Sequence, residues 1–478
     1  MIVAWLANLV SVQEMALRLL LSVLIAYPIV ICYRCFLYNN SNFSKQQTHL
    51  LFTACGIAIC WFNYGVETYH SFIAVTFTYA IINLLYRSPL LVPVSFIFHM
   101  SYLLIGYYKT ATESYDIKWT MAHCVLVLHL IGLTFDVSDA QKGKKPEVLG
   151  MTEERPLNVL EVFAFAYFPP CVIIGPQFGY KRFNNFLDKK FKGTQNLQHG
   201  IKRFLIGVTY LAIYQFLTFI VPADHFLTEG FVKSNFLYKL FLVSIWGRCT
   251  LYKYISCWIL SEGAAMCAGL TFVSRDEKTG EEDWSGCANI KLRIFENTSS
   301  FGEYVASFNV QTNLWVFQYV YKRLKFLNNK NISHLSTLLF LAIWHGFHSG
   351  YYQTFFMEFM LINFEKGILP AFNNNQKFQK ASESLPMKFA LFVIVKSYAF
   401  FIAGYCLIPF AYLRFGKWWA VYKSMYFVGH IVILPMMFVW KPLIINALNT
   451  CFPLEQKPST DASTDEKTIS EKTHQKSN

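Results

Sequence analysis

The residues best suited to chemistry lie in one apolar stretch, residues 340–359, which reads FLAIWHGFHSGYYQTFFMEF. It contains two histidines, His345 and His348, and one acid, Glu358. An ionisable side chain at membrane depth is costly, and it marks a reactive centre or a pathway by default. His345, inside a Trp-His-Gly triplet, is therefore the first candidate for chemistry. The alternative is that both histidines form hydrogen bonds between neighbouring helices.

The helices that carry this stretch are expected to lie in a membrane. Of the 478 residues, 54% are hydrophobic and only 15% are charged, and the mean hydropathy is +0.32, unlike an average soluble domain. A spanning helix needs about 20 mainly apolar residues, and by that measure the sequence predicts about eleven spans. Several are short, which favours tilted or broken helices that line a cavity. The expected fold class is therefore all-α, a polytopic integral membrane protein with a buried catalytic chamber.

Composition divides the chain into one membrane-embedded domain at residues 1–454 and a polar tail at residues 455–478. We expect the tail to be disordered, because it contains hardly any apolar residues. The formal net charge of +13 arises from lysines and arginines in short loops between apolar segments, such as residues 181–203. Cytoplasmic loops of membrane proteins carry this excess. The charge therefore predicts topology and not nucleic-acid binding, and it also suits a polyanionic cytosolic substrate.

Two further features predict how the chain runs through the membrane. The apolar segments at residues 237–246 and 252–272 are each expected to form a helix. The segment at residues 157–174 is interrupted by a proline pair and is followed by Gly-Pro-Gln-Phe at residues 175–178. Because proline cannot continue a helix, we expect a break or a re-entrant turn there.

Four motifs follow one another along the chain: GPQF at residues 175–178, YKYISCWILSEG at 252–263, ASFNVQTNLWVFQYVYKRLKFL at 306–327 and WHGFHSGYYQTFFMEF at 344–359. In this order they resemble the membrane-bound O-acyltransferase (MBOAT) family, and within it the lysophosphatidylcholine acyltransferase branch. The resemblance covers most of residues 157–359. It implies an acyl-CoA co-substrate, and a buried chamber that CoA reaches from the cytosol and lipid from the bilayer.

The resemblance also implies an asparagine and histidine pair as the catalytic residues. The family histidine falls on His345, and the family asparagine falls on Asn309, with Asn313 as a near-duplicate four residues later. A neutral histidine can remove the proton of a lipid hydroxyl. A positioned amide can orient that histidine or stabilise the oxyanion. No serine or cysteine stands in a recognisable nucleophile motif, which favours direct attack by the acceptor over an acyl-enzyme.

The remaining candidates would contact substrate. They are Asn313, Gln177 of GPQF, the aromatic residues Trp344 and Tyr351, the basic pair Lys322 and Arg323, and the acid Glu358. The basic pair either meets the phosphates of CoA or belongs to an ordinary interfacial belt. The acid either lines the lipid entrance, pairs with a basic residue, or stands in water at the end of a helix.

The favoured function is transfer of a fatty acyl group from acyl-CoA to the sn-2 hydroxyl of a lysophospholipid, in remodelling of endoplasmic-reticulum membranes. Lysophosphatidylcholine is the first acceptor, and lysophosphatidylethanolamine and lysophosphatidylserine are further candidates. The alternative is a transporter or lipid scramblase in which His345 and Glu358 form a polar path. Transport alone has no need of a Trp-His-Gly centre beside an asparagine motif. A family member that acylates a secreted protein is disfavoured by the match to the lysolipid branch.

No metal and no further cofactor are expected. The pair His345 and His348 stands alone, and it supplies too few ligands for a zinc or a di-iron site. The oligomeric state, a homo-oligomer included, is left open by the sequence.

Overall fold

The structure is a computed structural model that describes residues 2–9, 12–111, 117–142 and 156–453. The chain is helical apart from short connections and one antiparallel hairpin, in which β1 (Ser274–Arg275) pairs with β2 (Glu282–Asp283). Within the described ranges, seven helical segments are long and apolar enough to cross a membrane. The mostly helical membrane fold is thereby confirmed, whereas the count of about eleven spans stays a prediction. The predicted disordered tail lies outside the described residues.

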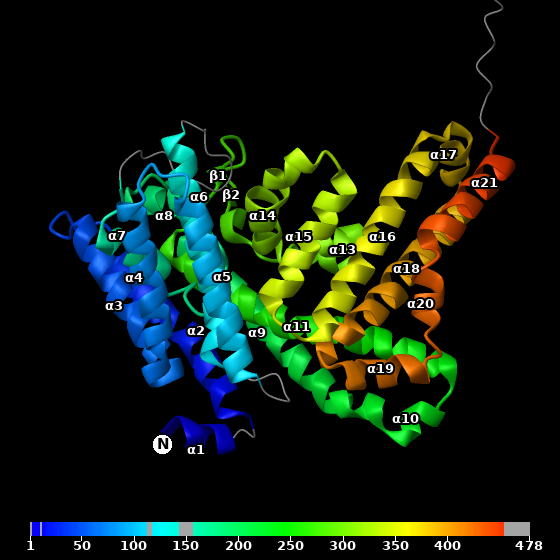
Figure 1. Ribbon diagram of the computed structural model, residues 1–478, viewed down its shortest axis with the longest axis horizontal. Coiled ribbons are helices and arrows are strands. Elements are labelled where there is room, and N and C mark those ends of the chain that lie inside the picture. Colours follow the sequence, from blue (N-terminus) through cyan, green and yellow to red (C-terminus); the bar gives the residue numbers. More distant parts are fainter. Residues whose placement is uncertain (1, 10–11, 112–116, 143–155, 454–478) are drawn as a thin grey trace, which may run out of the picture.

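The first eight α-helices form the group at the left of Figure 1. Its helices are α1 (Ile2–Leu9), α2 (Glu14–Cys32), α3 (Lys45–Tyr64), α4 (Tyr69–Leu84), α5 (Leu91–Thr110), α6 (Trp119–Gln141), α7 (Val159–Ala166) and α8 (Tyr180–Leu187).

Two long helices, α9 (Asn196–Ile220) and α11 (Phe236–Ala268), run between this group and the last helices of the chain (Figure 1). The short helix α10 (Glu229–Lys233) connects them. After the hairpin follow α12 (Leu292–Glu296), α13 (Phe301–Ser307), α14 (Val310–Tyr319), a 3-10 helix (Tyr321–Leu327), α15 (Lys330–His345), α16 (Ser349–Asn374), α17 (Gln376–Ser382), α18 (Leu385–Tyr412), α19 (Phe415–Ser424), α20 (Val428–Ile433) and α21 (Lys441–Cys451).

The helix α11 packs against α2, α9 and α18, and so it joins the two groups. The prediction of two separate helices in this region was wrong. The polar residues between them do not end the helix, because Arg248 forms an ion pair with Glu296 at 2.6 Å. Further along, Glu262 forms a buried ion pair with Arg203 of α9 at 2.9 Å. The helix ends where Gly269 adopts a left-handed conformation with φ of 99°, a common helix terminator.

The break predicted from the proline pair and the Gly-Pro-Gln-Phe segment at residues 175–178 is confirmed, and it begins earlier than the proline pair. The helix α7 ends at Ala166, and the chain then continues without a helix to Phe178, buried among other elements. The hydroxyl of Ser261 on α11 donates to the carbonyl oxygens of Pro170 and Gly175. Irregular backbone at membrane depth is tolerated only where protein or a cavity surrounds it, and here α11 supplies that contact.

Glycines allow α11 and α18 to cross in close contact. A β-carbon at Gly247 of α11 would lie 2.8 Å from the carbonyl oxygen of Gly404 on α18, and one at Gly404 would collide with the backbone of Ser244. Small residues at helix crossings let the backbones approach in this way. Both helices also supply walls of the cavity described below.

We predict that Gly404→Ala destabilises the protein by about 1–3 kcal/mol, because the added methyl group forces the two helices apart. The measurement is the thermal unfolding midpoint of the purified protein in detergent. Gly416→Ala on α19 is the matched control, because a β-carbon there has nothing within 4 Å, and it should leave the midpoint unchanged or slightly raised. Equal midpoints for the two variants would contradict the proposed close crossing.

A cavity around His345 as the candidate active site

The protein contains a cavity of about 290 Å³ between α11, α15, α16 and α18, with the segments before α8 and α14 as further walls. It is large enough for part of a substrate, and most of its lining is apolar. The predicted site residues that line it are Gln177, Asn309, Asn313, Trp344, His345, Tyr351 and Glu358. These residues come from segments far apart in the sequence, and the fold brings them to one place.

His345 is the last residue of α15. The helix ends there because Gly346 has φ of 121°. Glycine adopts this backbone conformation readily, whereas residues with a β-carbon do not. The imidazole ring stacks on the ring of Tyr351 with 4.9 Å between centroids, and it also contacts Phe355 at 5.7 Å. Within the described chain neither ring nitrogen forms a hydrogen bond. The His345 ring is thus positioned by contacts with aromatic rings, and its nitrogens are available to bind a ligand.

Trp344 fixes the end of α15 to the first group of helices. Its indole nitrogen donates to the carbonyl oxygen of Cys124 on α6 at 2.9 Å, and the Tyr107 hydroxyl of α5 donates to the Trp344 carbonyl oxygen at 3.2 Å. His348, three residues after His345, stands immediately before α16 and is not among the residues that line the cavity. The two histidines of the motif therefore have different surroundings.

The two candidate asparagines also differ in what their side chains do. The amide nitrogen of Asn313 donates to the carbonyl oxygens of Val305 and Phe308, both at 3.0 Å, and so it caps the end of α13. The side-chain oxygen of Asn309 accepts from the amide of Asn289 at 3.2 Å. In the described structure no protein acceptor is bonded to the side-chain amide nitrogen of Asn309. Asn309 thus keeps a donor for a ligand, whereas the donor of Asn313 is used by the fold.

Asn309 has a left-handed backbone, with φ of 51° and ψ of 43°, which asparagine tolerates better than most residues. Asn289 also contacts the first turn of α14, because its side-chain oxygen accepts a hydrogen bond from the Gln311 backbone amide at 3.0 Å. On the other side of this segment, Glu365 of α16 accepts from the backbone amides of Phe301 at 2.6 Å and Gly302 at 2.8 Å. Neither Asn289 nor Glu365 was predicted from the sequence, because each is a single polar residue outside the four motifs.

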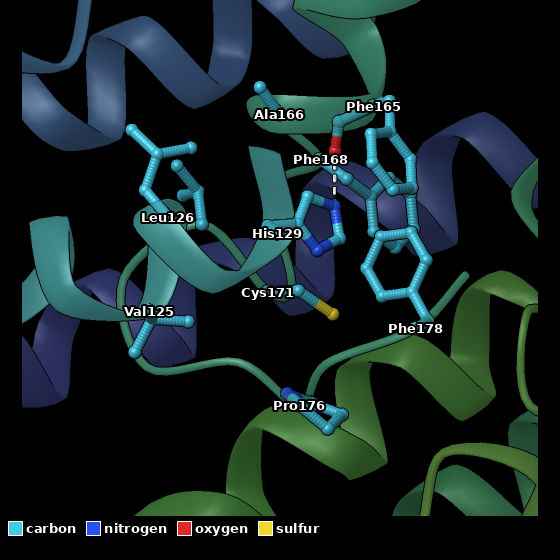
Figure 2. A pocket seen from close by; sticks show the side chains of 10 residues that line it. Val125, Leu126, His129, Phe165, Ala166, Phe168, Cys171, Pro176 and Phe178 are labelled. Atoms are coloured by element: carbon cyan, nitrogen blue, oxygen red, sulfur yellow. Dashed lines mark hydrogen bonds between the residues drawn. The ribbon is translucent and has the colours of Figure 1, made fainter. Parts of the chain in front are cut away.

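Gln177 has a supporting position in the cavity wall. Its amide nitrogen donates to the Val125 carbonyl oxygen at 2.7 Å, and its side-chain oxygen lies 3.0 Å from Nδ1 of His129. The other ring nitrogen of His129 lies 3.2 Å from the carbonyl oxygen of Phe165, the contact drawn in Figure 2. The adjoining pocket in that view has a volume of only about 10 Å³. Gln177 therefore ties the irregular segment to α6.

The basic pair Lys322 and Arg323 lies in the 3-10 helix after α14 and not among the residues that line the cavity. Arg323 donates to the carboxylate of Asp139 at the end of α6, with a 3.0 Å contact from Nη1, and it lies over the ring of Phe135. The ammonium group of Lys322 lies 5.1 Å from the ring centroid of Phe317. Arg323 thus holds α6 and the 3-10 helix together, and contact with CoA phosphates stays a prediction for both residues.

A family model of the membrane-bound O-acyltransferases matches residues 104–403, a range that includes most of the residues that line the cavity and both members of the Asn309 and His345 pair. The chain belongs to this family, and it is an acyltransferase.

Relatives with assigned names are similar over nearly the whole chain. Lysophospholipid acyltransferase 5 of Drosophila melanogaster is 42% identical over 88% of this chain and 86% of its own length. The protein of the same name from Homo sapiens is 36% identical over 91% of this chain and 90% of its own. That of Caenorhabditis elegans is 30% identical over 95% and 97%.

We predict that Asn313→Ala lowers the free energy of unfolding by about 1 kcal/mol, because the part-buried carbonyl oxygens of Val305 and Phe308 each lose a hydrogen bond. Thermal unfolding in detergent measures this change. Asn331→Ala is a suitable control, since that side chain is exposed on α15 and an exposed substitution is nearly neutral. An unfolding midpoint for Asn313→Ala equal to that of Asn331→Ala would show that the cap contributes nothing.

Proposed function

We propose that the protein transfers a fatty acyl group from acyl-CoA to the sn-2 hydroxyl of a lysophospholipid. The names of its relatives support this acceptor, because each is called a lysophospholipid acyltransferase and matches over most of its length. The observation that carries the proposal is the His345 ring at the cavity, which is held by aromatic contacts and whose nitrogens form no hydrogen bond with the described residues. The acceptors are lysophosphatidylcholine, lysophosphatidylethanolamine and lysophosphatidylserine, and acyl-CoA is the co-substrate.

The reaction needs a base and an oxyanion donor, and the cavity has one candidate for each. His345, neutral in its apolar surroundings, accepts the proton of the sn-2 hydroxyl as the hydroxyl oxygen attacks the thioester carbonyl carbon. The carbonyl oxygen becomes an oxyanion, to which the side-chain amide of Asn309 donates a hydrogen bond. The carbon–sulfur bond then breaks, the new ester is released, and the proton passes from His345 to the CoA thiolate. The protons and electron pairs balance without a covalent enzyme intermediate or a further cofactor.

The substrates fit a membrane-embedded site with two entrances. The lysophospholipid arrives from the bilayer, and the charged portion of acyl-CoA arrives from the cytosol. The basic loops that flank the apolar segments indicate which side of the membrane is cytosolic. We place this activity in phospholipid remodelling at the endoplasmic reticulum, where the lipid substrates would be supplied in the same membrane.

We predict that wild-type protein releases free CoA from a polyunsaturated acyl-CoA only when lysophosphatidylcholine is present. His345→Ala should reduce the rate about 10²–10⁴-fold, the usual contribution of a general base. A thiol-reactive dye follows the release of CoA from purified protein in detergent. His348→Ala is the matched control, because it removes the neighbouring histidine outside the cavity, and it should retain most of the activity. If no lysolipid stimulates release from wild-type protein, the enzymatic proposal fails and transport should be tested.

Two substitutions of Asn309 test whether its side-chain amide matters for catalysis apart from its left-handed backbone conformation. Asn309→Asp keeps the oxygen that accepts from Asn289 but has no amide donor, and Asn309→Gly tolerates the left-handed backbone. Both variants should lower kcat about 10²–10³-fold, because loss of one oxyanion donor has this effect in other acyl-transfer sites. Initial rates at saturating acyl-CoA provide the measurement. Retention of wild-type kcat by either variant would remove Asn309 from the proposed mechanism.

A further inference from the structure

Two charged side chains line the otherwise neutral or apolar cavity in its described part, Lys253 of α11 and Glu358 of α16. The proposed mechanism uses neither of them. Lys253 has its ammonium group 4.8 Å from the ring centroid of Tyr254. A charged group beside an apolar cavity is costly to maintain unless it meets an opposite charge. The question is therefore which charge Glu358 meets.

Glu358 differs from the buried acids of the protein in its lack of a partner. The carboxylate of Glu262 pairs with Arg203, that of Glu365 accepts two backbone amides and the Tyr398 hydroxyl, and that of Asp136 accepts from the Tyr319 hydroxyl. Within the described residues no hydrogen bond or ion pair reaches Glu358. This protein thus satisfies its buried acids with its own donors, and Glu358 is the exception that faces the cavity.

The position of Glu358 on α16 relates it to the catalytic histidine. Tyr351, Thr354, Phe355 and Glu358 all line the cavity, and their spacing of three, four and seven residues places them on one face of the helix. Tyr351 stacks on His345. Glu358 lies about 10 Å further along the helix axis, at 1.5 Å per residue. A lysophospholipid bridges a comparable length between its sn-2 hydroxyl and the nitrogen of its headgroup.

We infer that Glu358 binds the cationic amine of the lysophospholipid headgroup and thereby selects acceptors that carry such an amine. The inference rests on the proposed function. The phosphates of CoA are anionic and would be repelled by this carboxylate, so the acceptor is the substrate that it suits. Choline, ethanolamine and serine headgroups all contain the required cation, whereas a glycerol headgroup has the same phosphodiester without it.

The test compares acylation of lysophosphatidylcholine with acylation of lysophosphatidylglycerol by wild-type protein, Glu358→Gln and Glu358→Asp. We expect Glu358→Gln to reduce the ratio of kcat/KM for the two acceptors at least about tenfold, mainly through a higher KM for the choline lipid. Glu358→Asp keeps the charge and should restore part of the ratio. An equal change for both acceptors, or a fall in kcat alone, would overturn the inference.

A second measurement needs only wild-type protein and so does not depend on folding of the variants. Single-chain phosphocholine and phosphoglycerol compounds that lack the sn-2 hydroxyl are compared as competitive inhibitors. The phosphocholine compound should inhibit at a concentration about tenfold lower, because it alone offers a cation to Glu358. Equal inhibition would overturn the inference while the acyltransferase activity stands. Absence of any lysolipid-dependent CoA release from wild-type protein would instead reject the proposed function itself.

Discussion

The need to satisfy polar groups away from water constrains the whole protein. A hydrogen-bonding group buried at membrane depth without a partner costs several kcal/mol on the scale of apolar transfer. The chain meets this requirement by pairing residues from distant segments: Arg203 with Glu262, Arg248 with Glu296, and Ser261 with the irregular segment after α7. These pairs determine where α11 lies. The position of α11 in turn determines one wall of the cavity.

Within the described residues, three polar groups at the cavity have no hydrogen-bond partner from the protein. The ring nitrogens of His345, the amide nitrogen of Asn309 and the carboxylate of Glu358 all belong to residues that line the same cavity. Groups close to them do have protein partners, as Asn313 and Gln177 illustrate. The fold therefore separates residues that hold the walls from residues that are available to substrate. A list of polar residues in the cavity would not make this distinction, because it depends on which atoms already have partners.

The sequence predicted the helical membrane fold, the break that ends at residues 175–178 and the family, because apolar run length, proline and local motifs are properties of short segments. It did not predict that α11 is continuous. The polar residue Arg248 inside this helix is paired with Glu296, which lies 48 residues further along the chain, and short segments of sequence do not reveal such a partner. The same limit applied to Asn309 and Asn313. Both fit the motif, and only the contacts with Val305, Phe308 and Asn289 separate them.

The proposed arrangement assigns catalysis and acceptor choice to two positions on one face of α16. His345 is held by Tyr351 near the start of α16, and Glu358 lies two turns further along the same face. An interaction with the headgroup at that distance contributes equally to the bound substrate and to the transition state, and so it changes KM more than kcat. In the proposed mechanism an interaction at Asn309 strengthens only as the oxyanion forms, and so its loss should change kcat. Because α16 is a continuous helix, the two effects can vary independently while the distance between them stays fixed.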